Sequence, residues 1–147
     1  MKAIAYNITS FEKETLILVN HKKHEFAFIA EKLSIENAYL ASGKGVLLIF
    51  PNDVIGADIL PILKESGIRY LACTTVNTDH IDRKAAGALG FKISNIPAHT
   101  LNGISDEDSL RVRLEQVVKN LDLWGKGKCV GKACACMNSC AKKAVEL

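Results

Sequence analysis

The chain has 147 residues, 48% of them hydrophobic and 24% charged, with a formal net charge of +3 at pH 7. This length is typical of one domain, and the composition is that of a globular rather than a disordered protein. No apolar run reaches the roughly 20 residues of a membrane-spanning helix, and the N-terminus turns polar at Asn7, too early for a signal peptide. We therefore expect a cytoplasmic protein that does not enter membranes.

Strand-like and helix-like segments alternate along the chain. Short apolar runs predict strands, and apolar residues at helical spacing predict helices. The predicted strands cover residues 2–7, 25–30, 46–50, 69–73 and 91–95. The predicted helices cover residues 11–20, 35–41, 56–66 and 83–89, followed by a long helix over 106–124.

Local signals mark where several of these helices begin and end. Ser34 and Asp82 each stand just before a predicted helix, where a side-chain oxygen accepts a hydrogen bond from a free amide of the first turn. Gly67 and Gly90 each follow a helix, where glycine suits the left-handed exit. The acidic residues at 106–108 suit the positive end of the long helix's dipole.

This alternation implies a parallel sheet with helices on both faces. We expect an α/β, flavodoxin-like three-layer domain with a parallel five-stranded sheet, a C-terminal helix and a lysine- and cysteine-rich tail. The domain would span residues 1–124 and the tail residues 125–147. Five lysines in the tail stand against Glu146 alone, a balance of +4 that leaves −1 for the rest. Without interleaved aromatic residues, this basic tail does not predict nucleic-acid binding.

Two segments resemble a known family. TTVNTDHID at 74–82 and GFKISNIPAHT at 90–100 closely resemble the substrate-domain loops of the D-2-hydroxyacid dehydrogenases, with the greatest likeness to the D-lactate dehydrogenases. The resemblance covers roughly residues 1–105 and is strongest from 75 to 104. It implies that this chain corresponds to the N-terminal, substrate-binding (catalytic) domain of that family.

The resemblance also implies a ligand and its site. In the family, the loop after the fourth strand binds the substrate carboxylate with backbone amides, at the carboxyl end of the sheet where ligands of open α/β folds bind. Relatives usually carry Gly in place of Asn77, often Arg in place of Thr74, and Tyr in place of His99. The expected ligand is a small 2-hydroxy or 2-oxo carboxylate. The substrate-binding residues carried over are Thr75, Val76, Asn77, Thr78, Asp79 and His99.

The chain ends before the second domain that the family leads one to expect. The family's catalytic Arg, Glu and His lie in that domain, so no catalytic residue is assigned here. The glycines at 125, 127 and 131 depart from the spacing of a dinucleotide loop, and no apolar strand precedes them. We therefore expect that the chain alone binds no NAD and is not an active dehydrogenase, unless a separate NAD-binding protein completes a split enzyme.

Four cysteines of the tail form the pattern C-x4-C-x-C-x3-C: Cys129, Cys134, Cys136 and Cys140. Four thiolates can hold zinc or anchor an iron–sulfur cluster. A helix over 135–143 would place Cys136 and Cys140 on one face. However, the C-x-C step is not a common zinc or cluster spacing, so redox-active or oxidised thiols and a tail without special chemistry remain open. Cys73 lies in a buried-strand pattern and is predicted to be a core residue.

Three functions are consistent with these residues. The leading hypothesis is a stand-alone domain that binds a small carboxylate without dehydrogenase activity of its own. The second is a metal or thiol-redox module that acts through the tail cysteines. The third is one subunit of a split NAD-dependent dehydrogenase. The sequence does not specify the oligomeric state.

Overall fold

A computed structural model describes residues 1–136 of the protein. Its five strands form one parallel sheet in the order β2-β1-β3-β4-β5, the flavodoxin-like order. The predicted α/β fold is confirmed. The strands are β1 (Lys2–Tyr6), β2 (Glu25–Ile29), β3 (Val46–Ile49), β4 (Tyr70–Cys73) and β5 (Lys92–Ser94). The α-helices are α1 (Ser10–Asn20), α2 (Leu60–Ser66), α3 (Arg83–Ala88) and α4 (Asp106–Gly125), and the short 3-10 helices are η1 (Ala38–Ala41), η2 (Ala98–Leu101) and η3 (Gly131–Ala133).

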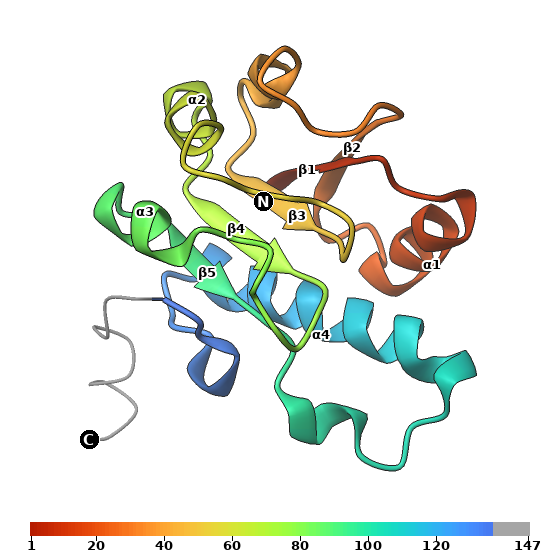
Figure 1. The fold of residues 1–147 in the computed structure, drawn as a ribbon. Helices are drawn as coiled ribbons and strands as arrows, with labels where there is room; N and C mark the ends of the chain where they lie inside the picture. The colour runs from red at the N-terminus through yellow and green to blue at the C-terminus, as the bar shows by residue number, and fades with distance from the viewer. Residues whose placement is uncertain (137–147) are drawn as a thin grey trace.

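The elements form three layers. Helices α1 and α4 lie together on one face of the sheet, and η1, α2 and α3 cover the opposite face (Figure 1). Each face has its own hydrophobic cluster, because successive residues of a strand point to opposite sides. In the part of the chain that the structure describes, no helix has the length and apolar character needed to cross a membrane.

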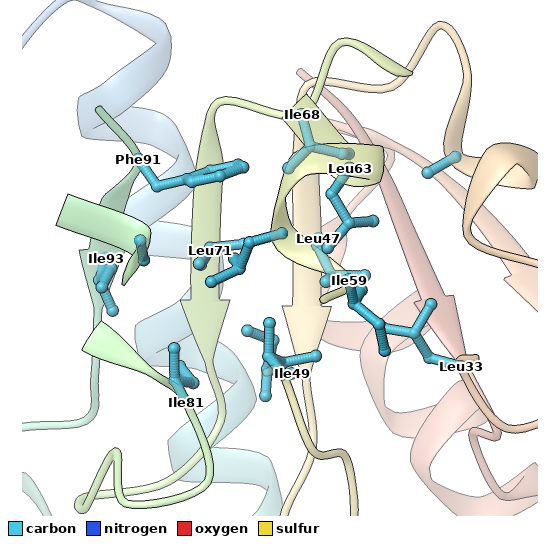
Figure 2. Packing of buried hydrophobic residues seen from close by; sticks show 14 of the residues in the cluster. Leu33, Leu47, Ile49, Ile59, Leu63, Ile68, Leu71, Ile81, Phe91 and Ile93 are labelled. Atoms are coloured by element: carbon cyan, nitrogen blue, oxygen red, sulfur yellow. The ribbon is translucent and has the colours of Figure 1, made fainter. Parts of the chain in front are cut away.

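The central strands are buried on both faces, as their continuous apolar sequences predict. All four residues of β3 are buried, and Leu47 pairs with Leu71 of β4 in register. Figure 2 shows both leucines on the face covered by α2. Cys73 ends β4 without solvent exposure, and burial raises the pKa of its thiol to about 12. The prediction that Cys73 is a core residue is confirmed.

Helix α4 closes the other face of the sheet. Leu114, Val117 and Leu121 are fully buried at helical spacing in the cluster on this side. Trp124 lies near the end of the helix with its ring 4.6 Å from that of Tyr70. The last turn of α4 is therefore fixed to the beginning of β4 by an aromatic contact.

The helix boundaries agree only in part with the sequence predictions. Asp82 caps α3 as predicted, because its Oδ1 accepts from the Ala85 amide at 2.9 Å. The prediction for Ser34 was wrong: its own amide donates to Asn37 Oδ1 at 2.8 Å. Asparagine side chains compete with helical hydrogen bonds in this way, and the expected helix is reduced to the 3-10 turn η1. Helix α2 begins at Leu60 rather than Gly56, with proline in its first turn.

The segment after α4 packs against the outer edge of β5. The Asn95 amide donates to the Ala133 carbonyl at 2.8 Å, and the Ala135 amide donates to the Ile93 carbonyl at 2.9 Å, in an antiparallel arrangement. The Arg83 guanidinium, from α3, donates twice to the Ala135 carbonyl, at 2.8 and 3.0 Å. We call residues 131–136 the edge segment.

Candidate carboxylate-binding site

The predicted site lies at the carboxyl end of the sheet. Because the strands are parallel, the loops after β3, β4 and β5 emerge at the same end (Figure 1). The loop at 75–80 follows β4, and η2, which contains His99, follows β5. The topology therefore brings the predicted substrate-binding residues to one end of the domain.

The backbone carbonyl groups of the loop are used in holding its shape. The Thr75 carbonyl accepts from the Ile96 amide at 2.9 Å, and the Val76 carbonyl accepts from Asn95 Nδ2 at 2.8 Å. The Asn77 carbonyl accepts from Thr75 Oγ1 at 2.7 Å. Two of these bonds connect the loop to residues that follow β5. All three occupy carbonyl groups of the loop and none of them uses a backbone amide of residues 76–78.

The backbone amides of the same loop are available. Among residues 1–136, the N–H groups of Val76, Asn77 and Thr78 donate to no partner. Val76 and Asn77 are exposed, whereas Thr78 is buried. Consecutive unpaired backbone N–H groups can hold an anion without a side-chain charge. The loop therefore presents unpaired amide donors of the kind that can bind an anion.

Arg113, in helix α4, donates a hydrogen bond to the residue that precedes this loop. Arg113 was not identified from the sequence. Its Nη1 donates to the Thr74 carbonyl at 2.9 Å, and its Nε donates to Ser109 Oγ at 3.2 Å. Burial lowers the pKa of the Arg113 guanidinium, and the charge of Glu12 opposes that shift. The signal was present in the sequence: Arg113 precedes the buried Val117 by four residues, so this charged residue lies on the apolar face of α4.

Thr74 stands where relatives often carry arginine. Its side chain is fully buried, and its Oγ1 donates to the Ile49 carbonyl at 3.1 Å. The threonine side chain is thus directed into the sheet and does not contribute a charge to the site. Arg113 is the cation that contacts this position, through the backbone of Thr74.

Asn77 stands where relatives usually carry glycine. In the described residues, the non-glycine positions with positive φ are Asn7, His21 and Lys22, so Asn77 does not use the left-handed region. Its side-chain Oδ1 lies 3.4 Å from the Asp79 amide, which donates to it. The turn therefore does not need the conformational freedom of glycine at this position.

The two histidines of this end differ in their surroundings. His99 is exposed within η2, and within residues 1–136 its side chain makes no hydrogen bond. His80 closes the loop, with its carbonyl accepting from the Ile55 amide at 2.9 Å and its Nε2 buried without a partner. Burial lowers the pKa of His80, whereas the charge of Asp79 raises it.

Asp53 adds a carboxyl group to this end of the sheet, and it was also missed. Its Oδ2 accepts from the Phe50 amide at 2.9 Å in the turn after β3, and the residue is only 3% exposed. Burial raises its pKa to about 6, with a further upward contribution from Glu12; the Phe50 hydrogen bond and Lys32 oppose the shift. An aspartate in a polar turn gives no sequence signal of burial.

Three of the four tail cysteines lie in the described residues. Cys134 is buried in the α4-side cluster, and Cys129 and Cys136 pack against it. Cys136 Sγ accepts from the Ile93 amide at 3.2 Å, so this residue lies along β5 and does not begin a helix. Within residues 1–136, no three His, Cys, Asp or Glu side chains come together as metal ligands. Cys140 and the rest of the helix predicted over 135–143 lie outside those residues, so the four-cysteine site stays a prediction.

The glycine-rich segment at 125–131 does not have the surroundings of a dinucleotide loop. A dinucleotide loop follows a strand and opens a helix, so that its glycines and the helix N-terminus hold the pyrophosphate. Here the glycine-rich segment follows helix α4 and leads into η3, a 3-10 helix of three residues. No hydride-transfer step is therefore assigned to this segment.

The fold defines an open, parallel α/β domain of flavodoxin-like order. Residues 3–133 match the family described as D-isomer specific 2-hydroxyacid dehydrogenase, catalytic domain. The chain belongs to this family.

Individual relatives agree with this assignment. The chain is 32% identical to a D-lactate dehydrogenase of Leuconostoc mesenteroides subsp. cremoris, over 83% of this chain and 38% of that protein. It is 31% identical to an aromatic 2-oxoacid reductase of Clostridium sporogenes, over 72% of this chain and 32% of that one. The apo structure of D-lactate dehydrogenase from Escherichia coli superposes with a TM-score of 0.64 at 29% identity, covering 69% of this chain and 35% of that one. The chain thus spans about a third of the length of the relatives it matches.

Proposed function

We propose that this domain binds a small 2-hydroxy or 2-oxo carboxylate through the backbone amides of Val76, Asn77 and Thr78. The observation that carries the proposal is the unequal use of the loop's polar groups. Its carbonyls are engaged in internal bonds, whereas these three amides have no partner in residues 1–136. A carboxylate supplies the acceptors that the amides lack, and charge-assisted bonds of this kind are stronger than neutral ones.

Two further features support this ligand class. Arg113 holds the Thr74 carbonyl and so fixes the start of the loop before a ligand arrives. A loop that is already ordered loses less conformational entropy on binding. The relatives named above are a D-lactate dehydrogenase and an aromatic 2-oxoacid reductase, and the substrates in those names are 2-hydroxy or 2-oxo acids.

A titration followed by NMR tests the proposal. D-Lactate and pyruvate at millimolar concentrations are expected to shift the amide resonances of residues 76–78 more than those of the rest of the domain. Lactamide, a neutral analogue of lactate, is the matched control and should leave them in place. If the amides of 76–78 do not respond to either acid, the carboxylate proposal is wrong.

We also propose that dehydrogenase chemistry requires a nicotinamide-binding part in addition to these residues. Hydride transfer needs the nicotinamide held next to the substrate carbon, and residues 1–136 offer no fitting dinucleotide loop. The coverage of about a third of each relative supports this division. Mixing the chain with a candidate nicotinamide-binding protein should produce hydroxyacid-dependent NAD reduction that neither protein gives alone. If a nicotinamide-binding protein binds this chain and the mixture still does not reduce NAD, the result would count against the proposal.

The tail cysteines are a separate proposal, as zinc or iron–sulfur ligands or as redox thiols. Cys129, Cys134 and Cys136 lie against the same hydrophobic cluster, which supports a common role. Deleting the tail would be a poor test, because it would also remove the edge segment from β5. Iron and zinc should instead be measured per chain after anaerobic purification, with Cys134→Ser and Cys136→Ser as comparisons. Substoichiometric metal together with full alkylation of the thiols would remove the metal-site proposal.

A further inference from the structure

We propose a second anion site, at the amino end of the sheet, that takes a small phosphorylated organic molecule. A cavity of about 320 Å³ opens there between the last turn of α2, the last turn of α3 and the beginnings of β4 and β5. It lies at the opposite end of the strands from the 75–80 loop. This inference is independent of the carboxylate proposal.

Three basic residues, Lys64, Arg69 and Lys92, line the cavity. Arg69 and Lys92 come from neighbouring strand starts, since the Lys92 amide donates to the Arg69 carbonyl at 3.0 Å. Within residues 1–136, none of the three forms an ion pair, and no aspartate or glutamate lines the cavity. Basic residues therefore border the cavity, and no acidic residue of the described chain lines it.

The helix ends at the cavity do not cancel this charge. The C-terminus of a helix carries about half a negative charge, so two helices contribute roughly −1 against three full positive charges. Their last carbonyls are also occupied. Gly67 donates its amide to the carbonyls of Leu63 and Lys64, and the Leu89 amide lies within hydrogen-bonding reach of the final carbonyls of α3. The formal charges of the residues that line the cavity therefore exceed the opposing charge of the helix ends.

The rest of the lining gives the cavity an apolar side. Figure 2 shows Phe91 and Ile68 near the beginnings of the strands, on the face that carries Leu71. Both residues line the cavity together with Leu89. Binding pockets for small molecules begin at about 300 Å³ and combine apolar walls with a few polar groups. This size and lining suit a compact organic group that carries a phosphate, because arginine and lysine recognise phosphate strongly.

The test uses phenyl phosphate as the probe, with inorganic phosphate and phenol as comparisons. Phenyl phosphate should shift the amide resonances of Gly67 and Gly90, which border the cavity, and should bind more tightly than inorganic phosphate. Phenol lacks the charge and should not bind. Binding of both phosphates with equal affinity would mean that the apolar wall is unused and that the proposed organic ligand is wrong.

Charge variants locate the binding. Arg69→Gln and Lys92→Gln should each weaken phenyl phosphate binding about tenfold, as expected for one lost charge-assisted contact. Lys84→Gln, an exposed lysine of α3 outside the cavity, is the matched control and should change the affinity less than twofold. Equal losses in all three variants would show only a general charge effect. Shifts confined to residues 76–78 would place the phosphate in the carboxylate loop instead; either result overturns the second site.

Discussion

The two ends of the sheet offer an anion different kinds of donor. At the carboxyl end, the donors are backbone amides of residues 76–78, and Arg113 lies beneath them, bound to a carbonyl. At the amino end, the donors are the exposed side chains of Lys64, Arg69 and Lys92 around a cavity. Backbone amides held in a fixed loop fit an anion in one position, whereas long lysine and arginine side chains can adjust to anions in several positions. One small domain would then combine two anion sites, one built from backbone amides and one from basic side chains.

The two arrangements also differ in their entropic cost. The loop amides are positioned by hydrogen bonds present before any ligand binds. Lysine and arginine side chains lose up to about 2 kcal/mol of rotamer freedom each when a ligand fixes them. Binding at the carboxyl end should therefore cost less conformational entropy than binding at the amino end.

The largest expected effect comes from removing the support beneath the loop. Arg113→Gln leaves the Thr74 carbonyl without its charged donor, at a position where the threonine is fully buried. We expect a loss of about 2 kcal/mol in the free energy of unfolding, the usual cost of an unsatisfied buried group. Chemical denaturation measures it. Arg111→Gln is the matched control on the same helix, because Arg111 makes an exposed i,i+4 pair with Glu115 and should cost under about 0.5 kcal/mol. Similar losses in both variants would show that Arg113 has no special supporting role.

The next largest effect is expected from a substitution that removes one amide donor at the carboxyl end. Asn77→Pro deletes an amide that has no partner in the described residues, so the protein should fold while pyruvate binding weakens by about tenfold or more. Asn77→Ala removes the same side chain but keeps every loop amide, and it should bind pyruvate nearly as the unchanged chain does. Phenyl phosphate binding at the amino end should be the same in both variants. Unchanged pyruvate affinity in Asn77→Pro would mean that this amide is not a ligand.

A third prediction concerns the buried carboxyl group at the carboxyl end. Burial raises the pKa of Asp53 in the folded protein to about 6 from an ordinary value of 3.8. The folded state therefore binds the proton more tightly than the unfolded state, and stability falls as pH rises from about 4 to 6. Asp53→Asn removes this charge and should be more stable than the unchanged chain at pH 7, by about 1–2 kcal/mol.

The pH dependence of the stability difference between Asp53→Asn and the unchanged chain distinguishes the titration of Asp53 from other effects of the substitution. The advantage of Asp53→Asn should shrink as the pH falls from 6 and should vanish well below 3.8, where Asp53 is protonated in both states. Asp58→Asn, which changes an exposed aspartate a few residues later, is the matched control. A variant at position 53 that is less stable at every pH would show that the Phe50 amide requires a carboxylate.

The smallest expected effect is a difference in the salt dependence of anion binding at the two ends of the sheet. Raising the salt concentration from about 0.05 to 0.5 M shortens the screening length and weakens interactions between exposed charges. Phenyl phosphate binding at Lys64, Arg69 and Lys92 should weaken several-fold, and pyruvate binding at the loop should change less than about twofold. Isothermal titration at both salt concentrations measures the two affinities. Equal salt dependence would mean that the two ends bind anions by the same mechanism.

The sequence predicts this fold well because its strongest patterns are the ones that the core uses. The run at 46–50 became the fully buried β3, and the acids at 106–108 stand in the first turn of α4. The predicted starts of two helices were wrong, near Asn37 and Pro61. At Asn37, the side chain hydrogen-bonds to the backbone in place of a helical bond, and the sequence does not specify which of these bonds forms.

The position of the loop was predictable from the sequence, but its supporting contacts were not. The family resemblance placed the loop after the fourth strand, where the structure has it. Arg113 is 39 residues from Thr74 in the sequence, and that contact exists only once α4 packs on the sheet. The burial of Asp53 and the pairing of the edge segment with β5 likewise depend on tertiary packing. No local pattern encodes such contacts.

The edge segment also determines how this domain can assemble with copies of itself. A sheet with two open edges can add neighbours at both sides and grow into a ribbon. Here the β5 edge is covered by residues 131–136, which Arg83 holds in place, and a partner strand so short is a poor template for further pairing. The other edge strand is β2. Within the described residues, the edge segment therefore hinders edge-to-edge pairing at β5.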